Sequence, residues 1–251
     1  SPNNAIFWLQ YTFVGIKFRP IINKTRNLKM KKLYKLDNIN LNYNVNGNDI
    51  RVLKNINFEL KKNERVALIG ESGSGKTSLL MLMSGLEKPS TGSIFFENKD
   101  FSVISEEQKT AIRKKKIGLV FQQFYLIPNY TALENVMFPM QINKIKNEKE
   151  KATLILSDIG LENRINNLPS ELSGGEQQRV AIARAVSFNP EVILADEPTG
   201  NLDRKNTERV SNLLFNYSKK KKISLFLVTH NTNLAKKCDR VINLFDGQIK
   251  N

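Results

Sequence analysis

The sequence predicts an α/β fold built around a mainly parallel sheet. Four short apolar runs are each followed at once by polar residues, and stretches with helical apolar spacing separate them. These runs and their followers are residues 66–69 before Gly70, 117–121 before Gln122, 192–195 before Asp196 and Glu197, and 223–229 before His230. Because the carboxyl ends of parallel strands meet at one edge of a sheet, we expect a ligand site there.

The bulk composition describes a globular chain with an unusual charge. A length of 251 residues suits one large domain or two small ones, and the net charge is +15. Such charge could indicate nucleic acid or an anionic membrane surface. We favour a general bias towards lysine and asparagine, because no aromatic residues interleave with the scattered basic runs. The single cysteine, Cys238, excludes an internal disulfide and fits a reducing compartment. No apolar run reaches the roughly 18 to 20 residues of a membrane span.

Residues 1–29 differ from the rest of the chain. They carry basic residues and no acidic ones, and the run 5–16 is apolar and contains the only tryptophan. This run could be a membrane-surface anchor with a basic flank. It could also belong to a targeting signal, although no small-residue cleavage site is clear and the basic residues lie on the wrong side. We favour a third interpretation, in which residues 1–29 are an extension that does not belong to the domain that follows and lies upstream of a natural start at Met30, since the chain opens on Ser1.

The segment after residue 30 predicts a β-rich entry to the main domain. Apolar residues alternate with polar ones over 39–43 and 56–60, as in half-buried strands. Asparagine, glycine and aspartate at 46–49 predict the turn between them. A turn at 89–92 leads to a further strand at 93–96.

Helical patterns fill most of the remaining chain. The expected helices cover 78–83 with an end near Gly85, 106–116, 131–137, 148–159, 173–185 and 207–217. Those between 123 and about 175 lie between two core strands, so we expect an inserted helical subdomain, with Pro128, Pro139 and Pro169 punctuating it. Residues 241–249, with Asp246 and Gly247, predict a terminal hairpin.

The loop after the first apolar run has the pattern G-x-x-x-x-G-K-T between a strand and a helix. Its glycines allow consecutive backbone N–H groups to face phosphate oxygens, Lys76 adds a charge for the β- and γ-phosphates, and the Thr77 hydroxyl is placed to bind Mg²⁺. The helix start adds its positive dipole end. The alternative is a glycine-rich turn with a lysine on its rim, which the flanking strand and helix disfavour. The expected nucleotide-binding residues here are Gly70, Glu71, Ser72, Gly73, Ser74, Gly75, Lys76, Thr77 and Ser78.

Two further strand ends carry residues suited to phosphate chemistry. Asp196 is placed to hold Mg²⁺, and Glu197 to orient or deprotonate an attacking water. Adjacent carboxylates at a buried strand end are costly unless a cation or a reaction needs them. His230 is the only histidine, and although a lone histidine is more often structural, its place after a strand lets it reach a γ-phosphate.

A second helix start also predicts anion binding. Ser173 is a good N-cap, and Gly174 and Gly175 expose N–H groups before Glu176. An ordinary capped helix would look the same. One chain rarely needs two such termini for one phosphate group, so this one is expected to serve a nucleotide held by another copy.

Together these motifs resemble the ATP-binding subunits of ABC transporters over about residues 33–251. The resemblance implies a P-loop NTPase core of the RecA-like kind, an antiparallel β subdomain and the helical subdomain at about 123–175, all within an ATP-binding domain at 31–251. The motifs occur in the family's order: phosphate loop 70–77, glutamine loop at Gln122, signature 172–177, Asp196 with Glu197, D-loop 201–203, and switch His230.

The resemblance also implies roles for these residues. Two copies would dimerise head to tail, each binding ATP between one phosphate loop and the other copy's signature, with Asp203 in the D-loop. Glu197 would be the catalytic base, and His230 would hold the γ-phosphate. Gln122 would contact Mg²⁺, sense the nucleotide and connect to the membrane subunit near 122–128 and the helical insert. Tyr43 matches the aromatic residue that stacks on adenine.

Segments 121–128, 131–136 and 196–203 resemble the branch of lipoprotein-release and macrolide or peptide exporters. The expected function is ATP hydrolysis, at the cytoplasmic face of the cell membrane, that powers a separate permease. The alternative is a cell-division ATPase that regulates a membrane partner without transport. A P-loop GTPase is disfavoured because no N-K-x-D tetrad occurs, and the chain lacks the second ATPase half, coiled coil or zinc insertion of members that act on nucleic acid or ribosomes. We therefore expect no nucleic-acid partner.

Overall fold

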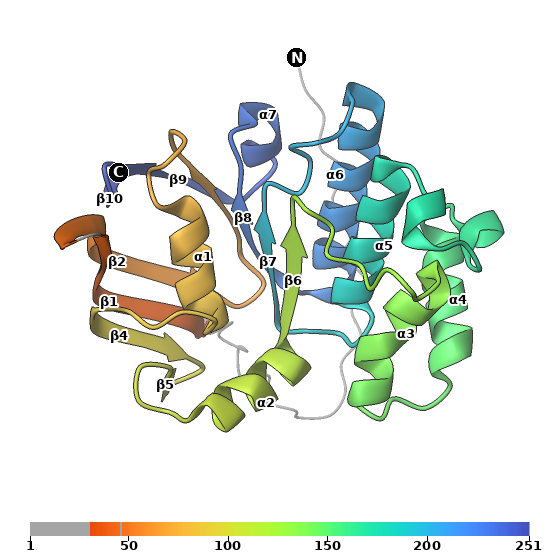
Figure 1. Cartoon of the computed structure of the whole chain (residues 1–251), viewed down its shortest axis with the longest axis horizontal. Helices are drawn as coiled ribbons and strands as arrows, with labels where there is room; N and C mark the ends of the chain where they lie inside the picture. Colours follow the sequence, from red (N-terminus) through yellow and green to blue (C-terminus); the bar gives the residue numbers. More distant parts are fainter. Residues whose placement is uncertain (1–30, 46, 251) are drawn as a thin grey trace, which may run out of the picture.

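The computed structural model describes residues 31–45 and 47–250, and it contains two sheets with helices packed around them (Figure 1). The strand order is β10-β9-β3-β8-β7-β6 in the larger sheet and β2-β1-β4-β5 in the smaller. The α/β fold class is confirmed. The extension predicted at 1–29 lies outside the described residues.

The larger sheet is the mainly parallel core. Its strands are β3 (Arg65–Ile69), β6 (Ile117–Phe121), β7 (Val192–Asp196), β8 (Ser224–Val228), β9 (Arg240–Phe245) and β10 (Gln248–Lys250). All neighbours pair in parallel except β10, which pairs antiparallel with β9. All five residues of β8 are buried, because helices cover one face and the second sheet with α1 covers the other. The predicted terminal hairpin is β9 and β10.

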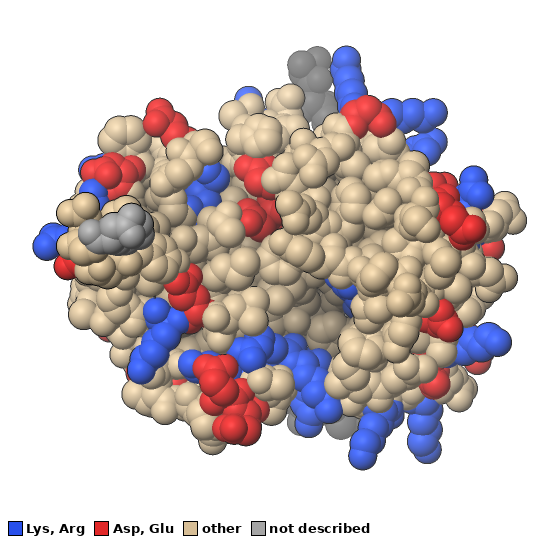
Figure 2. All heavy atoms as spheres, in the orientation of Figure 1, with Lys and Arg blue, Asp and Glu red and all other residues tan. Residues whose placement is uncertain are grey.

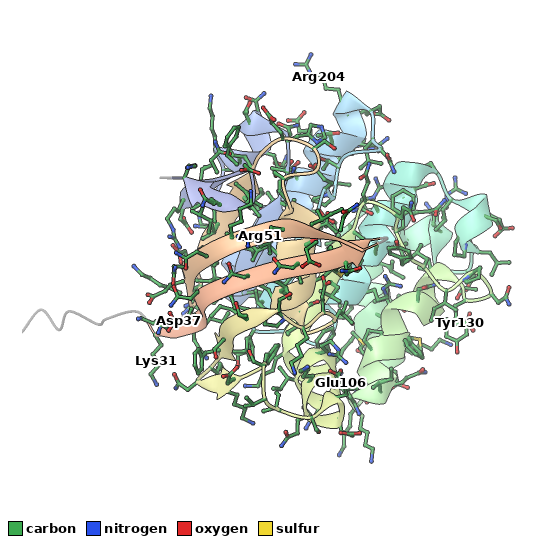
Figure 3. All side chains as sticks on the ribbon, turned by 60° about the vertical axis from the view of Figure 1, so that its left-hand side comes forward. Lys31, Asp37, Arg51, Glu106, Tyr130 and Arg204 are labelled. Atoms are coloured by element: carbon green, nitrogen blue, oxygen red, sulfur yellow. The ribbon has the colours of Figure 1, made fainter. Side chains whose placement is uncertain are left out.

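The smaller sheet is antiparallel and stands against the core. It consists of β1 (Lys32–Val45), β2 (Asn48–Lys61), β4 (Thr91–Phe96) and β5 (Lys99–Asp100). Figure 3 shows β1 and β2 side by side across the front, with Asp37 and Arg51 marking them. The aromatic ring of Phe58 on β2 packs 5.4 Å from that of Phe226 on β8, so the two sheets share one apolar core.

The helical subdomain has an apolar core of its own. Helices α3 (Ala132–Ile142), α4 (Glu148–Asp158) and α5 (Gly174–Val186) enclose Val136, Met140, Leu156 and Val180. The far side of α5 packs on the core sheet through Ile182 and neighbouring residues. Helix α5 therefore belongs to both regions. Short 3₁₀ helices at Glu162–Arg164 and Pro169–Glu171 connect α4 to α5.

The remaining helices are α1 (Lys76–Ser84), α2 (Glu106–Lys116), α6 (Arg204–Lys221) and α7 (Thr232–Ala235). Several bounds differ from the sequence prediction: β1 and β2 extend well beyond the strands expected at 39–43 and 56–60. Helix α3 continues through Pro139, and β4 begins two residues early at Thr91. Helix α6 begins at Arg204 because the side chain of Asp203 caps it by accepting a hydrogen bond from the Asn206 N–H. Among the described residues, no helix has the length and apolar character that crossing a membrane requires.

Candidate active site

A cavity of about 490 Å³ lies at the carboxyl ends of the core strands. It brings together the glycine loop after β3, Gln122 after β6, Asp196 and Glu197 at the end of β7, and His230 after β8. The lining residues are Tyr43, Val52, Gly70, Ser72, Gly73, Gly75, Lys76, Thr77, Ser78, Gln122, Asp196, Glu197 and His230. Of these, only Val52 on β2 was not among the candidates from the sequence. The convergence at one edge follows from the parallel order of the strands.

The glycine loop is fixed between the two sheets. A Cβ atom on Gly70 would lie 2.2 Å from the carbonyl oxygen of Leu244 on β9, so only glycine fits. Gly75 has a φ of 99° and would place a Cβ 3.0 Å from the Val52 carbonyl oxygen on β2. The loop is thus held from β9 on one side and from β2 on the other, which fixes its backbone at the edge of the cavity.

Lys76 is the first residue of α1 and is only 9% exposed. Its ammonium group donates hydrogen bonds to the carbonyl oxygens of Gly70, at 2.9 Å, and Glu71, at 2.7 Å. An ammonium group has three donors, so one remains for a ligand in the cavity that Lys76 lines. The loop therefore holds a positive charge beside its own N–H groups, as a polyphosphate requires.

Thr77 and Asp196 form a pair suited to a hard divalent cation. The Thr77 hydroxyl donates a 2.8 Å hydrogen bond to Oδ2 of Asp196. Oδ1 of Asp196 is buried and has no hydrogen-bond partner among the described residues. Burial raises the pKa of Asp196, since the charged form is poorly solvated there. No group of three histidine, cysteine or acidic side chains that could hold a metal occurs in residues 31–45 and 47–250. This donor set fits Mg²⁺, which takes one or two protein oxygens and completes its shell with phosphate and water.

Glu197 has a strained backbone and contacts His230. Its φ is 46°, in the left-handed region that non-glycine residues rarely adopt and that costs about 1–3 kcal/mol. Its carboxylate Oε2 lies 3.0 Å from Nδ1 of His230, whose side chain is 70% exposed. Sequence patterns placed both residues at strand ends, but they gave no sign of this contact. A residue with a strained backbone, whose carboxylate lies beside an accessible imidazole, is typical of a reaction site.

Gln122 and Tyr43 lie at the rim. The Gln122 side-chain amide donates a 2.8 Å hydrogen bond to Oδ1 of Asn201, which ties the segments after β6 and β7 together. The Tyr43 hydroxyl donates to the carboxylate of Glu87, which follows α1. That bond orients the ring beside the cavity, where it is partly exposed and available for stacking.

The second helix start lies outside the cavity. Ser173 caps α5 through a capping box: its hydroxyl accepts from the N–H of Glu176, and the Glu176 carboxylate accepts from the N–H of Ser173 at 2.8 Å. The latter bond lowers the pKa of Glu176. A Cβ on Gly175 would lie 2.5 Å from the Asn206 side chain, beside the cap of α6 at Asp203. Within one chain, none of residues 173–176 or Asp203 lines the cavity.

A second, apolar cavity of about 700 Å³ lies between α2, β6, α3 and α5, and sequence patterns did not reveal it. Phe121, Tyr125 and Phe138 are among its lining residues, which include three basic side chains, Arg113 and Lys114 on α2 and Arg184 on α5, and no acidic one. We call it the groove. Figure 2 shows it as a hollow with basic atoms at its lower edge and inside.

Arg184 marks the floor of the groove. Its guanidinium donates to the carbonyl oxygens of Tyr125, at 2.6 Å, and Phe124, at 3.1 Å. Burial lowers the pKa of Arg184. The charge is held by backbone carbonyls in the segment that follows Gln122, so the groove and the rim of the active site share one stretch of chain.

Comparison with known proteins gives consistent matches. The family model described as ABC transporter matches residues 53–200. The lipoprotein-releasing system ATP-binding protein LolD of Wigglesworthia glossinidia brevipalpis is 41% identical over 219 residues, covering 86% of this chain and 96% of that protein. LolD of Francisella tularensis subsp. holarctica (strain OSU18) is 43% identical over 216 residues, covering 85% and 94%.

Solved structures match equally well. The dimeric structure of MJ0796, a bacterial ABC transporter cassette, has a TM-score of 0.82 at 40% identity and covers 87% of this chain and 97% of its own. A dimeric post-hydrolysis state of the same cassette, bound to ADP and Pi, has a TM-score of 0.81 at 40% identity with the same coverage.

Proposed function

The chain belongs to the ABC transporter family as an ATP-hydrolysing subunit that powers a membrane component, and we propose that the cavity at the strand ends is its hydrolytic site. The observation that carries this proposal is the convergence of Lys76, Thr77, Asp196, Glu197 and His230 on one cavity of about 490 Å³. They bring together an ammonium group that can bind phosphate, a hydroxyl and a carboxylate that can bind a divalent cation, and a second carboxylate that can orient a water molecule. Phosphoryl transfer to water requires these groups.

The chain's own residues divide the work. The loop N–H groups and Lys76 bind the β- and γ-phosphates, and Thr77 and Asp196, with Gln122 beside them, would hold Mg²⁺. The metal would neutralise charge that develops on the phosphate oxygens. Glu197 orients the attacking water and accepts its proton, and His230 donates a hydrogen bond to the γ-phosphate. Catalysis on this scheme is mostly positioning and charge stabilisation.

We further propose that the working unit is a homodimer with two shared sites. The capping box at the start of α5 uses the N–H groups of Ser173 and Glu176 and leaves those of Gly174 and Gly175, and this helix start lies away from the cavity of its own chain. In a head-to-tail dimer it would complete the other copy's site, with Asp203 beside it. The dimeric state of the MJ0796 cassette supports this arrangement.

The membrane partner is proposed to be a permease that docks in the groove, and the transported class to be lipoproteins. The names of the LolD relatives support that class and the export branch over the cell-division alternative. The groove is apolar, basic and free of acidic lining residues, so a docking segment with apolar side chains and a carboxylate would complement it. The subunit would then sit on the cytoplasmic face of the membrane as a peripheral protein.

The test of the hydrolytic site is Glu197→Gln. We expect hydrolysis to fall by about 10²–10⁴-fold, while ATP binding persists and ATP induces a stable dimer in light scattering. Glu191→Gln is the matched control, because Glu191 lies just before the opposite end of β7 and pairs with Lys62 at 3.1 Å. Rapid hydrolysis by Glu197→Gln would refute the assignment of Glu197 as base.

A further inference from the structure

The side chain of Gln178 bridges three parts of the molecule. It lies on α5, one turn after the capped start at Ser173, and its exposed fraction is 0%. Its amide nitrogen donates to the carbonyl oxygen of Pro198, at 2.7 Å, and to that of Phe121, at 3.2 Å. Because both neighbours are acceptors, the amide nitrogen must face them, so the orientation of the group is fixed by its surroundings.

These two carbonyl groups adjoin the reacting residues. Phe121 directly precedes Gln122, and Pro198 directly follows Glu197. Both N–H donors of one amide are thereby used to join the end of β6 to the chain after β7. The Gln122 to Asn201 hydrogen bond joins the same two segments at the surface. Gln178 supplies a buried side-chain link between these segments.

The strained backbone of Glu197 explains why such a tie is needed. A non-glycine residue with a φ of 46° persists only when its surroundings over-determine it. The N–H of Glu197 donates to the Val228 carbonyl at 2.9 Å, and its own carbonyl accepts from the N–H of Gly200 at 3.0 Å. Gln178 adds the next anchor along the chain, at Pro198, and this anchor comes from helix α5.

We infer that Gln178 is a positioning residue: it holds the carboxylate of Glu197 in its reactive place and links that place to the signature helix α5. This inference rests on the proposed function. In the proposed dimer, the start of α5 touches the nucleotide bound mainly by the other copy, while Gln178 on the same helix is tied to the catalytic loop of its own copy. ATP bound at the site of one copy therefore changes the position of Glu197 in the site of the other copy.

The test uses Gln178→Met, which keeps the side-chain volume and removes both donors. We expect kcat for ATP to fall by about 10- to 100-fold, the cost of a misplacement near 1 Å, with KM changed by less than about twofold. The Hill coefficient for ATP should fall towards 1. Gln178→Asn, whose amide is one methylene shorter and reaches one carbonyl at most, should lie between Met and the native residue, and serves if the Met variant does not fold.

Asn135→Leu is the matched control for a purely structural effect. The Asn135 amide is also 0% exposed and donates to the carbonyl oxygens of Ile127, Tyr130 and Thr131, but none of these adjoins a reacting residue. We expect this variant to lower the melting temperature at least as much as Gln178→Met and to leave kcat per folded molecule unchanged. Equal kcat losses in the two variants would overturn the inference.

A double-mutant cycle decides whether Gln178 acts through Glu197. In the Glu197→Gln background, Gln178→Met should slow single-turnover hydrolysis by less than about twofold. Once the carboxylate of residue 197 has been removed, moving that residue cannot lower the rate much further. A full additive loss would overturn the inference. Normal kcat in Gln178→Met with a dead Glu197→Gln would also overturn it and leave the proposed function standing, whereas full hydrolysis by Glu197→Gln would overturn the proposed function itself.

Discussion

The active-site cavity and the groove differ in what holds their side chains in place. In the cavity, several polar groups lie at strand ends or in the glycine loop and are held by hydrogen bonds, such as Lys76 to the loop carbonyls and Thr77 to Asp196. The groove is lined by apolar side chains from both the core and the helical subdomain. On the proposed function, the core would set the chemistry of ATP hydrolysis, and the groove between the core and the helical subdomain would set which partner is driven.

The largest expected effect is on the cavity side of this comparison. Lys76→Ala removes the buried ammonium from the phosphate loop, so hydrolysis should fall by about 10²–10³-fold or more, as for loss of a preorganised charge-stabilising donor. Steady-state ATPase assays and ATP-binding titrations measure this loss. Lys54→Ala is the control, since Lys54 on neighbouring β2 forms an exposed pair with Asp246. Equal losses in both variants would show that general basicity, rather than the placed ammonium, matters.

The second prediction separates the groove from the cavity. Phe138→Asp introduces a negative charge among the groove's lining residues and should weaken binding to the membrane partner by about tenfold or more, because the new carboxylate would repel the carboxylate proposed for the docking segment and compete with it for the basic side chains. Basal ATPase activity should stay within about twofold. Leu154→Asp, on the exposed side of α4 and outside the groove, should change neither quantity. Co-purification with the permease and basal ATPase assays measure the two. A loss of basal ATPase activity in Phe138→Asp would contradict the proposal that the groove serves partner binding and the cavity serves hydrolysis.

The third prediction concerns the free energy of unfolding that is lost because the Asp196 carboxylate, the proposed cation ligand, is buried. Because burial raises the pKa of Asp196, the folded state binds a proton there more readily than the unfolded state does. Stability from this group therefore falls as the pH rises between the unfolded and the folded pKa. Asp196→Asn should raise the melting temperature of the nucleotide-free protein by about 2–4 °C at neutral pH, corresponding to about 1 kcal/mol.

That gain should shrink to nothing at acidic pH, where the native carboxyl is protonated in both states. Asp196→Asn should also lose the extra stabilisation that Mg²⁺ with ATP gives the native protein. Thermal shift assays across pH, with and without Mg²⁺ and ATP, measure both. A melting temperature that falls at every pH would contradict the argument from burial.

The smallest effects come from the helix caps in the two regions. Thr131 caps α3 in the helical subdomain, and Ser105 caps α2 beside the core; each hydroxyl accepts from a backbone N–H within a capping box. Thr131→Ala and Ser105→Ala should each cost about 1 kcal/mol of unfolding free energy. Denaturant titration with hydrogen exchange should localise the first loss to 132–142 and the second to 106–116. A uniform loss across the chain would show that the regions unfold together.

The sequence predicted the core better than the joint because the two depend on different information. Residues 66–77 carry strand, loop and helix start within one continuous stretch, so the local pattern was sufficient to place Lys76. Residues 192–197 and 223–230 were equally local. Helix α3 was predicted too short because Pro139 normally ends a helix, whereas here it lies in the last turn, and the Asn143 side chain donates to its carbonyl.

Contacts between distant segments could not be read in this way. The approach of His230 to Glu197 depends on the pairing of β7 with β8, and the tie from Gln178 depends on how α5 packs beneath two loops. Neither leaves a periodic trace in the sequence. The groove is similar, because its lining comes from α2, β6, α3 and α5 and exists only once these elements have packed.

The position of β3 in the sheet bears on how the subunit is made. Val66 pairs with Phe226 on β8 and with Arg240 on β9, so the strand that carries the phosphate loop has both neighbours near the other end of the chain. During synthesis on the ribosome the loop emerges early, but its strand has no partner until β8 and β9 follow. ATP therefore stabilises the finished subunit and cannot stabilise the nascent chain before β8 and β9 have been made.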